Sequence, residues 1–287
     1  MTAAGRIALA RRSARCRSCG LTAYPLDARA GLDGFLSPQA TRLACTAAAS
    51  WSFAVASARL EEFAGIRLDD ETIRRHGHRA AGALADRRRA APPRAAFAGA
   101  EGHAEFLTDG VMAPTRGGWR ELKLAVFQKR PAGEPAEPRD WSTRALPAPS
   151  ASVAYASVAD CESFSAWWGE RAAGLGIDPA GELTVLGDGA AWIWAAAAVR
   201  FPAAAQVLDI FHAGQHLAAA AKGLDGEGTA AAADWTDRGR RALLADGWPG
   251  LMDHIGGTPA GGRTEVGQAA LDELIAYFAK QTGRLGY

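Results

Sequence analysis

Hydrophobic and polar positions change their period twice along the chain. Residues 36–90 and 225–287 carry apolar side chains at the three- and four-residue spacing of amphipathic helices. Between residues 104 and 224, short apolar runs typical of strands alternate with helical stretches. The pattern therefore predicts a helical region, a mixed α/β region and a second helical region, with residues 91–103 as a linker after the first.

The α/β region predicts the order β-β-β-α-β-α-β-α. Its strands are expected at residues 104–112, 119–129, 152–159, 182–188 and 205–211. Its helices are expected at residues 161–175, 190–201 and 212–224. Three strands of hairpin type followed by βα units indicate a mixed sheet with helices on its faces.

Two helices of the first region meet at a glycine turn. One is expected from Pro38 to about Glu62, and the next starts after Gly65 with Asp69 or Asp70 as its N-cap. A helix, a short turn and a second helix with a basic face form the outline of a DNA-binding helix-turn-helix over residues 52–80. Any two-helix hairpin produces the same outline.

Composition and charge narrow the class of protein. With 287 residues, 48% hydrophobic and 22% charged, the chain is that of one or two globular domains. No apolar run reaches the roughly 18 residues of a membrane span, so a cytoplasmic location is expected. The net charge is only +1, yet seven Arg face a single Asp between residues 74 and 94. These arginines are either a solvated helix face or phosphate contacts, the candidates being Arg74, Arg75, Arg79, Arg87, Arg88 and Arg89.

Four cysteines do not make a disulfide framework in a chain of this size. Residues 5–20 predict a strand that ends in a knuckle at Cys16 and Cys19, a C-x-x-C pair that supplies half of a structural zinc site. Cys45 and Cys161 stand alone among apolar residues and are expected to be buried thiols.

Two aspartates stand in apolar strands and are each followed by glycine. Asp109 lies within the first predicted strand and Asp188 closes the fourth. An aspartate in an apolar strand is costly unless it is hydrogen-bonded, paired or bound to a metal, so turn-capping and metal-binding roles compete. If the first and fourth strands lie side by side, the two carboxylates meet and offer the hard oxygen ligands that suit Mg²⁺ or Mn²⁺.

A D-x-x-H-x-x-x-H pattern occupies the junction between the last strand and helix. His212 and His216 share one helix face and could bind zinc, or Asp209 caps the helix and orients His212 in the core; the second interpretation is favoured. Five tryptophans offer stacking surfaces for bases, although their apolar context favours core positions: Trp119, Trp167, Trp168, Trp192 and Trp194.

Three blocks of sequence resemble the bacterial ISKra-type insertion-sequence transposases, DDE transposases related to Mutator-like elements. They are CRSCGLTAYPLDARAGL at 16–32, TDGVMAPTRGGWRELKLAVF at 108–127, and LGDGAAWIW at 186–194 with VLDIFHAGQHL at 207–217. The resemblance implies an RNase H-like core at residues 104–224, with Asp109 and Asp188 as the first two metal-binding carboxylates. It also implies that Asp209 and His212 are the accessory D-x-x-H element.

The same resemblance assigns the remaining segments. Residues 1–35 resemble part of a zinc ribbon, 36–90 a helical DNA-binding region, and 225–287 a helical insertion that is incomplete. The expected partner is DNA at insertion-sequence ends, together with further copies or a full-length transposase, in a nucleoid-associated bacterial protein.

Two departures from the family pattern lower the expected activity. The first C-x-x-C of the ribbon is missing, and so is the Gly-Ser-Gly-x-x-Glu motif that carries the third carboxylate. Glu265, Asp272 and Glu273 lie in the insertion helices and are not assigned this role. The chain is therefore expected to be truncated at both ends and to have little activity. The alternative function is a DNA- or transposase-binding regulator without chemistry; an unrelated small-molecule enzyme is poorly supported because no Gly-rich phosphate loop occurs.

Overall fold

The computed structural model describes residues 1–287 except 4, 33, 91–93, 116 and 260–263, and of residues 88–90 it describes the backbone alone. The chain divides into two compact units, residues 1–92 and 93–287, which we call the N-terminal unit and the sheet unit. Within the described residues, no helix is both long and apolar enough to cross a bilayer.

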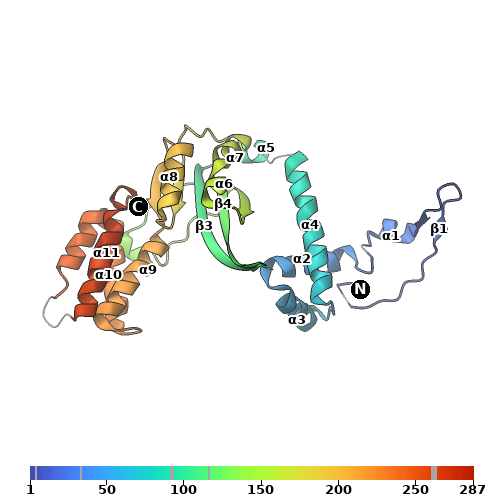
Figure 1. The fold of residues 1–287 in the computed structure, drawn as a ribbon, viewed down its shortest axis with the longest axis horizontal. Coiled ribbons are helices and arrows are strands. Elements are labelled where there is room, and N and C mark those ends of the chain that lie inside the picture. The colour runs from blue at the N-terminus through green and yellow to red at the C-terminus, as the bar shows by residue number, and fades with distance from the viewer. Residues whose placement is uncertain (4, 33, 91–93, 116, 260–263) are drawn as a thin grey trace. The chain divides into compact units, whose positions relative to one another are not determined.

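The sheet unit is built on five strands in the order β5-β4-β3-β6-β7. The first three run antiparallel, while β6 pairs parallel with β3 and β7 parallel with β6. The two longest strands, β3 and β4, lie side by side in Figure 1. The strands are β3 (His103–Thr115), β4 (Gly118–Arg130), β5 (Ala151–Ser157), β6 (Thr184–Gly187) and β7 (Ala205–Leu208). The mixed sheet predicted from the sequence is confirmed, including its strand order along the chain.

Helices occupy the connections between strands and all of the C-terminal region. They are α5 (Arg94–Ala98), α6 (Cys161–Ala166), α7 (Trp168–Gly174), α8 (Ala191–Arg200), α9 (Ile210–Asp225), α10 (Ala230–Gly256) and α11 (Glu265–Ala279). Two short 3-10 turns, η1 (Pro138–Asp140) and η2 (Thr282–Arg284), complete the described elements of this unit. Helices α9, α10 and α11 pack on one another, and α11 adds three side chains to the same core as the sheet, namely Leu271, Leu274 and Phe278.

An aromatic cluster fills the core of the sheet unit. Phe106 on β3 is fully buried, with ring centroids 4.7 Å from both Phe127 on β4 and Trp168 on α7. Phe201, after α8, lies 5.3 Å from the same ring. Because side chains alternate along a strand, burying Phe106 on this face directs Asp109, three residues on, to the opposite face.

The N-terminal unit has a smaller core made of small side chains. A two-stranded ribbon, β1 (Ala14–Arg15) and β2 (Thr22–Ala23), precedes α1 (Pro25–Ala30), α2 (Pro38–Ser50), α3 (Phe53–Ala64) and α4 (Asp70–Ala90). Ala40, Ala44 and Ala56 are fully buried between α2, α3 and α4, with Leu36, Ile66 and Ile73 around them. Alanine lets these helices approach closely, and each buried alanine contributes little apolar area.

Several predicted boundaries in the N-terminal unit were wrong. The single helix expected from Pro38 to Glu62 is two helices, because Trp51 is extended and the Ser52 hydroxyl accepts a hydrogen bond from the Val55 N–H at the start of α3. Of the strand expected within residues 5–20, the structure forms only the two residues of β1. The glycine turn and the cap are confirmed: Gly65 is left-handed, and Asp69 accepts from the Thr72 N–H at 2.7 Å.

The sheet unit also departs from the prediction in three places. The expected linker contains α5, whose Phe97 is buried in the aromatic core; residues 91–93 of that linker lie outside the described part. The helix expected at 161–175 divides at Trp167 into α6 and α7. The strand expected at 205–211 ends at Leu208, because the Asp209 carboxylate caps α9 and draws the two following apolar residues into that helix.

Candidate functional site

The register of β3 and β6 aligns the two aspartates singled out from the sequence. Leu107 lies opposite Leu186 in this parallel pair. Continuing the register by two residues places Asp109 opposite Asp188, just beyond the end of β6. The two residues are therefore brought together on neighbouring strands although 79 positions separate them in the chain.

A third aspartate follows at the same level. Gly187 on β6 lies opposite Leu208 on β7, so one further step aligns Asp188 with Asp209. The Asp209 N–H donates to the Gly187 carbonyl at 2.8 Å, which extends the pairing to this position. The carboxyl ends of parallel strands meet at one edge of a sheet, and polar groups at that edge are the usual location of ligand sites in open α/β sheets.

Each carboxylate stabilises its own turn through one oxygen. Asp109 Oδ1 accepts from the Gly110 N–H at 2.7 Å, Asp188 Oδ1 from the Ala190 N–H at 2.9 Å, and Asp209 Oδ1 from the Phe211 N–H at 2.9 Å. Asp109 is exposed, whereas Asp188 and Asp209 are half-buried. The turn-capping alternative is thus met, and it leaves Oδ2 of Asp109 and of Asp188 without a hydrogen-bonding partner among the described residues.

The donor set fits a hard cation that keeps most of its water. Mg²⁺ is usually held by one or two carboxylates, with waters and substrate phosphates as the remaining ligands. Asp109 and Asp188 supply two such oxygens on adjacent strands. Across the described residues, no group of three or more His, Cys, Asp or Glu side chains is arranged to hold a metal ion, so a closed all-protein site is not formed there.

Two side chains that the sequence does not point to contact the turn after β6, one from α11 and one from just after that helix. The Tyr277 hydroxyl donates to the Asp188 carbonyl at 3.0 Å, and Gln281 Nε2 donates to the Gly189 carbonyl at 3.0 Å. Gly189 has φ +96°, and a Cβ there would lie 2.4 Å from the Tyr277 hydroxyl. No local signal could have identified these partners, because about ninety residues separate them from the turn.

The negative charge of the neighbouring aspartates affects the pKa of Tyr277. Its burial, and then the negative charges of Asp188 and Asp209, raise the pKa of Tyr277 to about 12. The hydroxyl therefore stays protonated at neutral pH and remains a hydrogen-bond donor there.

The two histidines of α9 pack beside this helix. Their ring centroids are 5.1 Å apart, and the Tyr277 ring stacks on His216 at 3.6 Å. Burial, and then the neighbouring His212, lower the pKa of His216, so the neutral ring is favoured. The expected cap by Asp209 is confirmed for α9, but the hydrogen bond that its carboxylate accepts comes from Phe211, and His212 is only half-buried.

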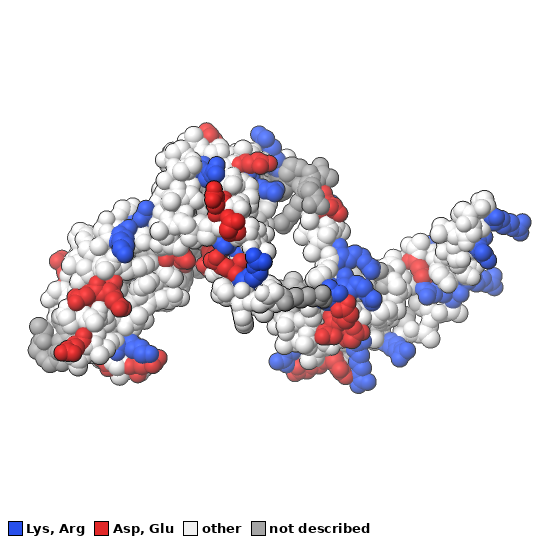
Figure 2. Space-filling view, in the orientation of Figure 1, with Lys and Arg blue, Asp and Glu red and all other residues white. Residues whose placement is uncertain are grey.

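The arginines proposed to contact phosphate lie on α4. Arg75, Arg79 and Arg87 are exposed, and Figure 2 shows basic side chains gathered on the visible face of the N-terminal unit with acidic ones among them. Arg74 is already engaged, since its guanidinium donates to both oxygens of Glu71 at 2.7 and 2.5 Å. The side chains of Arg88 and Arg89 lie outside the described residues.

The remaining candidates divide between core and surface. Trp168 and Trp194 are buried, and Trp167 and Trp192 are half-buried, as the core interpretation predicts, whereas Trp119 is 68% exposed at the end of the β3–β4 hairpin. Cys45 and Cys161 are half-buried rather than buried; Cys45 Sγ is 3.7 Å from the His76 carbonyl. Cys16 and Cys19 are exposed thiols.

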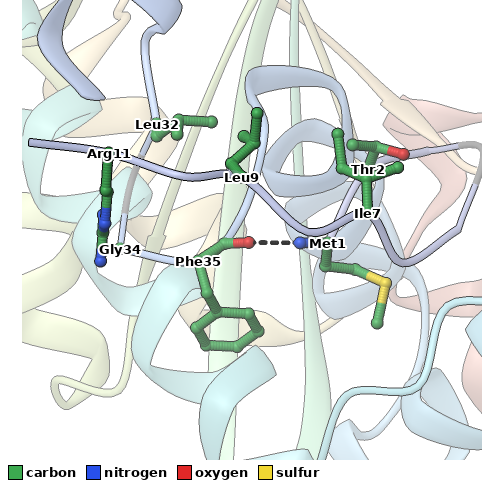
Figure 3. A pocket seen from close by; sticks show the side chains of 8 residues that line it. All are labelled: Met1, Thr2, Ile7, Leu9, Arg11, Leu32, Gly34 and Phe35. Carbon is green, nitrogen blue, oxygen red and sulfur yellow. Dashed lines mark hydrogen bonds between the residues drawn. The ribbon is translucent and has the colours of Figure 1, made fainter. Parts of the chain in front are cut away.

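A small cavity lies in the N-terminal unit beside the first residues of the chain. It measures about 180 Å³ and is lined by Met1, Ile7, Leu9 and Phe35 among others (Figure 3). Arg11, its charged lining residue, is paired with Asp27. No family model matches the chain, and no curated protein matches it either.

Proposed function

We propose that the sheet unit is an RNase H-like core of the DDE type, which cleaves and transfers DNA strands at the ends of an insertion sequence with the help of Mg²⁺ or Mn²⁺. The observation that carries the proposal is the alignment of Asp109 with Asp188 across β3 and β6. The strand order β5-β4-β3-β6-β7, with a three-stranded meander followed by two parallel strands, supports the same assignment.

Phosphodiester cleavage requires that the attacking oxygen be activated and that the negative charge developing on the leaving oxygen be neutralised. Divalent ions bound at such a site activate a water or a 3′-hydroxyl and stabilise the leaving oxygen. Asp109 and Asp188 would hold the ions, and Asp109 is the more exposed of the two. Asp209 orders the start of α9, and His212 follows it in the first turn of that helix.

The activity of this polypeptide is expected to be low. Only the first two of the three metal-binding carboxylates of the DDE family are present to hold two ions. The Gly-Ser-Gly-x-x-Glu motif that would carry the third does not occur in the sequence. A poorly held second ion lowers the rate by orders of magnitude. Metal binding is therefore a sharper test of the site than turnover.

The test is a titration of the full chain with Mn²⁺, in which binding is detected from the relaxation rate of water protons. We expect saturable binding that weakens at least tenfold in Asp109→Asn and in Asp188→Asn. Asp253→Asn, which removes an exposed aspartate on α10, is the matched control and should bind as the wild type does. Equal binding by all four proteins would refute the assignment of the two ligands.

A strand-transfer assay tests the expected rate. The substrate is duplex DNA from either side of the gene that encodes the chain, with Mn²⁺ as the metal. Little or no product is expected. Robust transfer that is lost in Asp109→Asn would support the family assignment and overturn the prediction of low activity.

A second candidate function is a DNA-binding regulator without chemistry. The exposed arginines of α4, after a helix and a left-handed Gly65 turn, favour it. Phosphate contacts release counterions, so binding to duplex DNA should weaken steeply with salt, and Arg75→Ala with Arg79→Ala should reduce the slope by about 2. Binding that ignores salt would exclude this role for α4.

A further inference from the structure

An exposed aromatic side chain follows the aspartate that ends β7. Phe211 is 67% exposed, and only its backbone N–H, which donates to the Asp209 carboxylate at 2.9 Å, takes part in the cap of α9. Ile210, the residue before it, packs against the aromatic core. The first turn of α9 is therefore held without help from the Phe211 ring. A solitary exposed apolar side chain is common on protein surfaces, so the neighbours of this ring decide what it means.

The aromatic neighbour of Phe211 comes from a distant loop. Trp141 lies between β4 and β5, and its ring centroid is 6.2 Å from that of Phe211, with the two planes at 66°. Trp141 is half-buried, so part of its indole is open beside the more exposed phenyl ring. We call these two side chains the aromatic platform. It begins two residues from Asp209, at the edge of the sheet where Asp109 and Asp188 are aligned.

Helix α10 fixes the indole of the aromatic platform. The Arg240 guanidinium lies over the ring of Trp141, with Cζ 3.9 Å from the centroid, and the indole N–H donates to Asp237 Oδ1 at 3.3 Å. A Cβ at Gly214 on α9 would lie 2.6 Å from Arg240 Nη2, so this glycine leaves the space that the guanidinium occupies. Because the indole is already ordered, a ligand that stacks there loses little binding energy to ordering it.

The position of the aromatic platform indicates the chemistry of its ligand. The neighbouring aspartates suit a hard divalent ion, whose remaining ligands are commonly waters and phosphate oxygens. Aromatic side chains bind flat rings by stacking, and every nucleobase has a face that can stack in this way. A nucleotide offers the phosphate and the flat ring together. Inside a duplex both faces of a base are covered by the neighbouring base pairs, so a base must leave the stack to reach protein rings.

We propose that Phe211 and Trp141 bind an unpaired nucleobase next to the phosphate held at Asp109 and Asp188. The sheet unit then takes DNA that is single-stranded, or locally unpaired, at the reacting position. This inference rests on the proposed function and specifies the form of its substrate. The two rings bind and orient the DNA, and no bond is made or broken at them.

The first test measures the affinity of the full chain for two short oligonucleotides in the presence of Mg²⁺, by fluorescence anisotropy. One is a single strand of thymidine, and the other has the same number of phosphates but no bases. Phe211→Ala should weaken binding of the thymidine strand about fivefold or more and leave binding of the abasic strand unchanged. Phe211→Tyr, which keeps a ring, should bind as the wild type does. Phe63→Ala, at a phenylalanine that is 68% exposed in the N-terminal unit, is the matched control and should change neither affinity.

The second test locates the bound base. Iodouracil in a single strand forms a covalent link on irradiation with an aromatic side chain on which it stacks, and the linked peptide is identified by mass spectrometry. We expect the link at Phe211 or Trp141, with a much lower yield when the iodouracil lies inside a fully paired duplex. Links confined to other residues, or an equal yield from the duplex, would overturn the proposal. So would equal affinity of Phe211→Ala and the wild type for the thymidine strand, or an equal loss with the abasic strand.

Failure of this inference is distinguishable from failure of the proposed function. The Mn²⁺ titration of Asp109→Asn and Asp188→Asn contains no DNA and does not depend on the aromatic platform. If metal binding depends on the two aspartates and no base is linked at Phe211 or Trp141, only the unpaired-base inference is wrong. If metal binding ignores both aspartates, the proposed function is wrong whatever the platform binds.

Discussion

The two units of the chain differ in how far apart in the sequence their interacting residues lie. In the N-terminal unit the chemistry is local: the knuckle occupies residues 16–21, and the Asp69 cap acts on Thr72, three residues away. In the sheet unit the features come from distant parts of the chain, as when Tyr277 donates to the carbonyl of Asp188. The cores of the two units also differ: small alanines fill the core of the N-terminal unit, and an aromatic cluster fills the core of the sheet unit.

The difference shows where each unit is vulnerable. Local hydrogen bonds depend on the nearby backbone and resist changes elsewhere, whereas an aligned set of strand ends depends on the packing of the whole sheet. The sheet unit should therefore respond strongly to loss of core volume and to loss of contacts at long range. The N-terminal unit should respond mainly to changes in its caps and charges.

The largest effect is expected for Phe106→Ala. Removing this fully buried ring, which contacts three aromatic residues, should lower the free energy of unfolding of the sheet unit by about 3–5 kcal/mol. Urea unfolding followed by tryptophan fluorescence measures it, because eight of the nine tryptophans lie in residues 93–287. Phe63→Ala, at a position 68% exposed in the N-terminal unit, is the control and should change stability by less than about 0.5 kcal/mol.

If Phe106→Ala lowers the unfolding transitions of both units together, the units do not behave independently. The difference between the two units would then be one of amino-acid composition and not of independent stability.

A smaller effect is expected for Tyr277→Phe. The change removes the hydrogen bond to the Asp188 carbonyl and keeps the ring on His216, so the sheet unit should lose about 1 kcal/mol. Thermal unfolding compared with that of Tyr24→Phe, an exposed tyrosine of the N-terminal unit, isolates the contribution of the hydroxyl. Equal stability of the two variants would mean that this long-range contact adds nothing to the sheet unit.

The smallest effect concerns the acid stability of the N-terminal unit. Hydrogen bonds from the Thr72 N–H and hydroxyl lower the pKa of Asp69 below its ordinary value of 3.8. A carboxyl whose pKa is lower in the folded state stabilises that state above the unfolded pKa, and the contribution is lost as pH falls through the folded pKa.

Asp69→Asn keeps a capping oxygen but does not titrate. We therefore expect the wild type to lose its advantage over this variant as the pH falls below 3.8, with circular dichroism of the helices as the measure. The effect is modest because Asp69 is exposed and its charge is screened. A difference between the two proteins that does not change with pH would contradict the assigned cause.

Residues whose structure depends on near neighbours were the ones that the sequence predicted well. The Gly65 turn, the Asp69 cap and the β3–β4 hairpin follow from short patterns. The end of β7 was missed because Ile210 and Phe211 look like strand residues, yet the Asp209 cap turns them into a helix.

The candidate site was predictable only in part. The two Asp-Gly steps drew attention to Asp109 and Asp188, and the inferred order of elements allowed their strands to be neighbours. The register that aligns them with Asp209 is a property of the assembled sheet. The contribution of Tyr277 and Gln281 required knowing how α11 packs, which no short pattern encodes.

The β3–β4 hairpin continues well past the strands beside it. β6 accompanies β3 only as far as Leu107 and β5 accompanies β4 only from Lys123 onward, so in the described structure the outer half of the hairpin has bare backbone edges. Such edges invite pairing with foreign strands and are a known route to aggregation. Arg120 and Glu121 lie on that half of β4, where charged side chains discourage such pairing, while Val111, Met112 and Trp119 are exposed nearby. The solubility of the protein should therefore depend on this protruding arm more than on any other surface of the sheet.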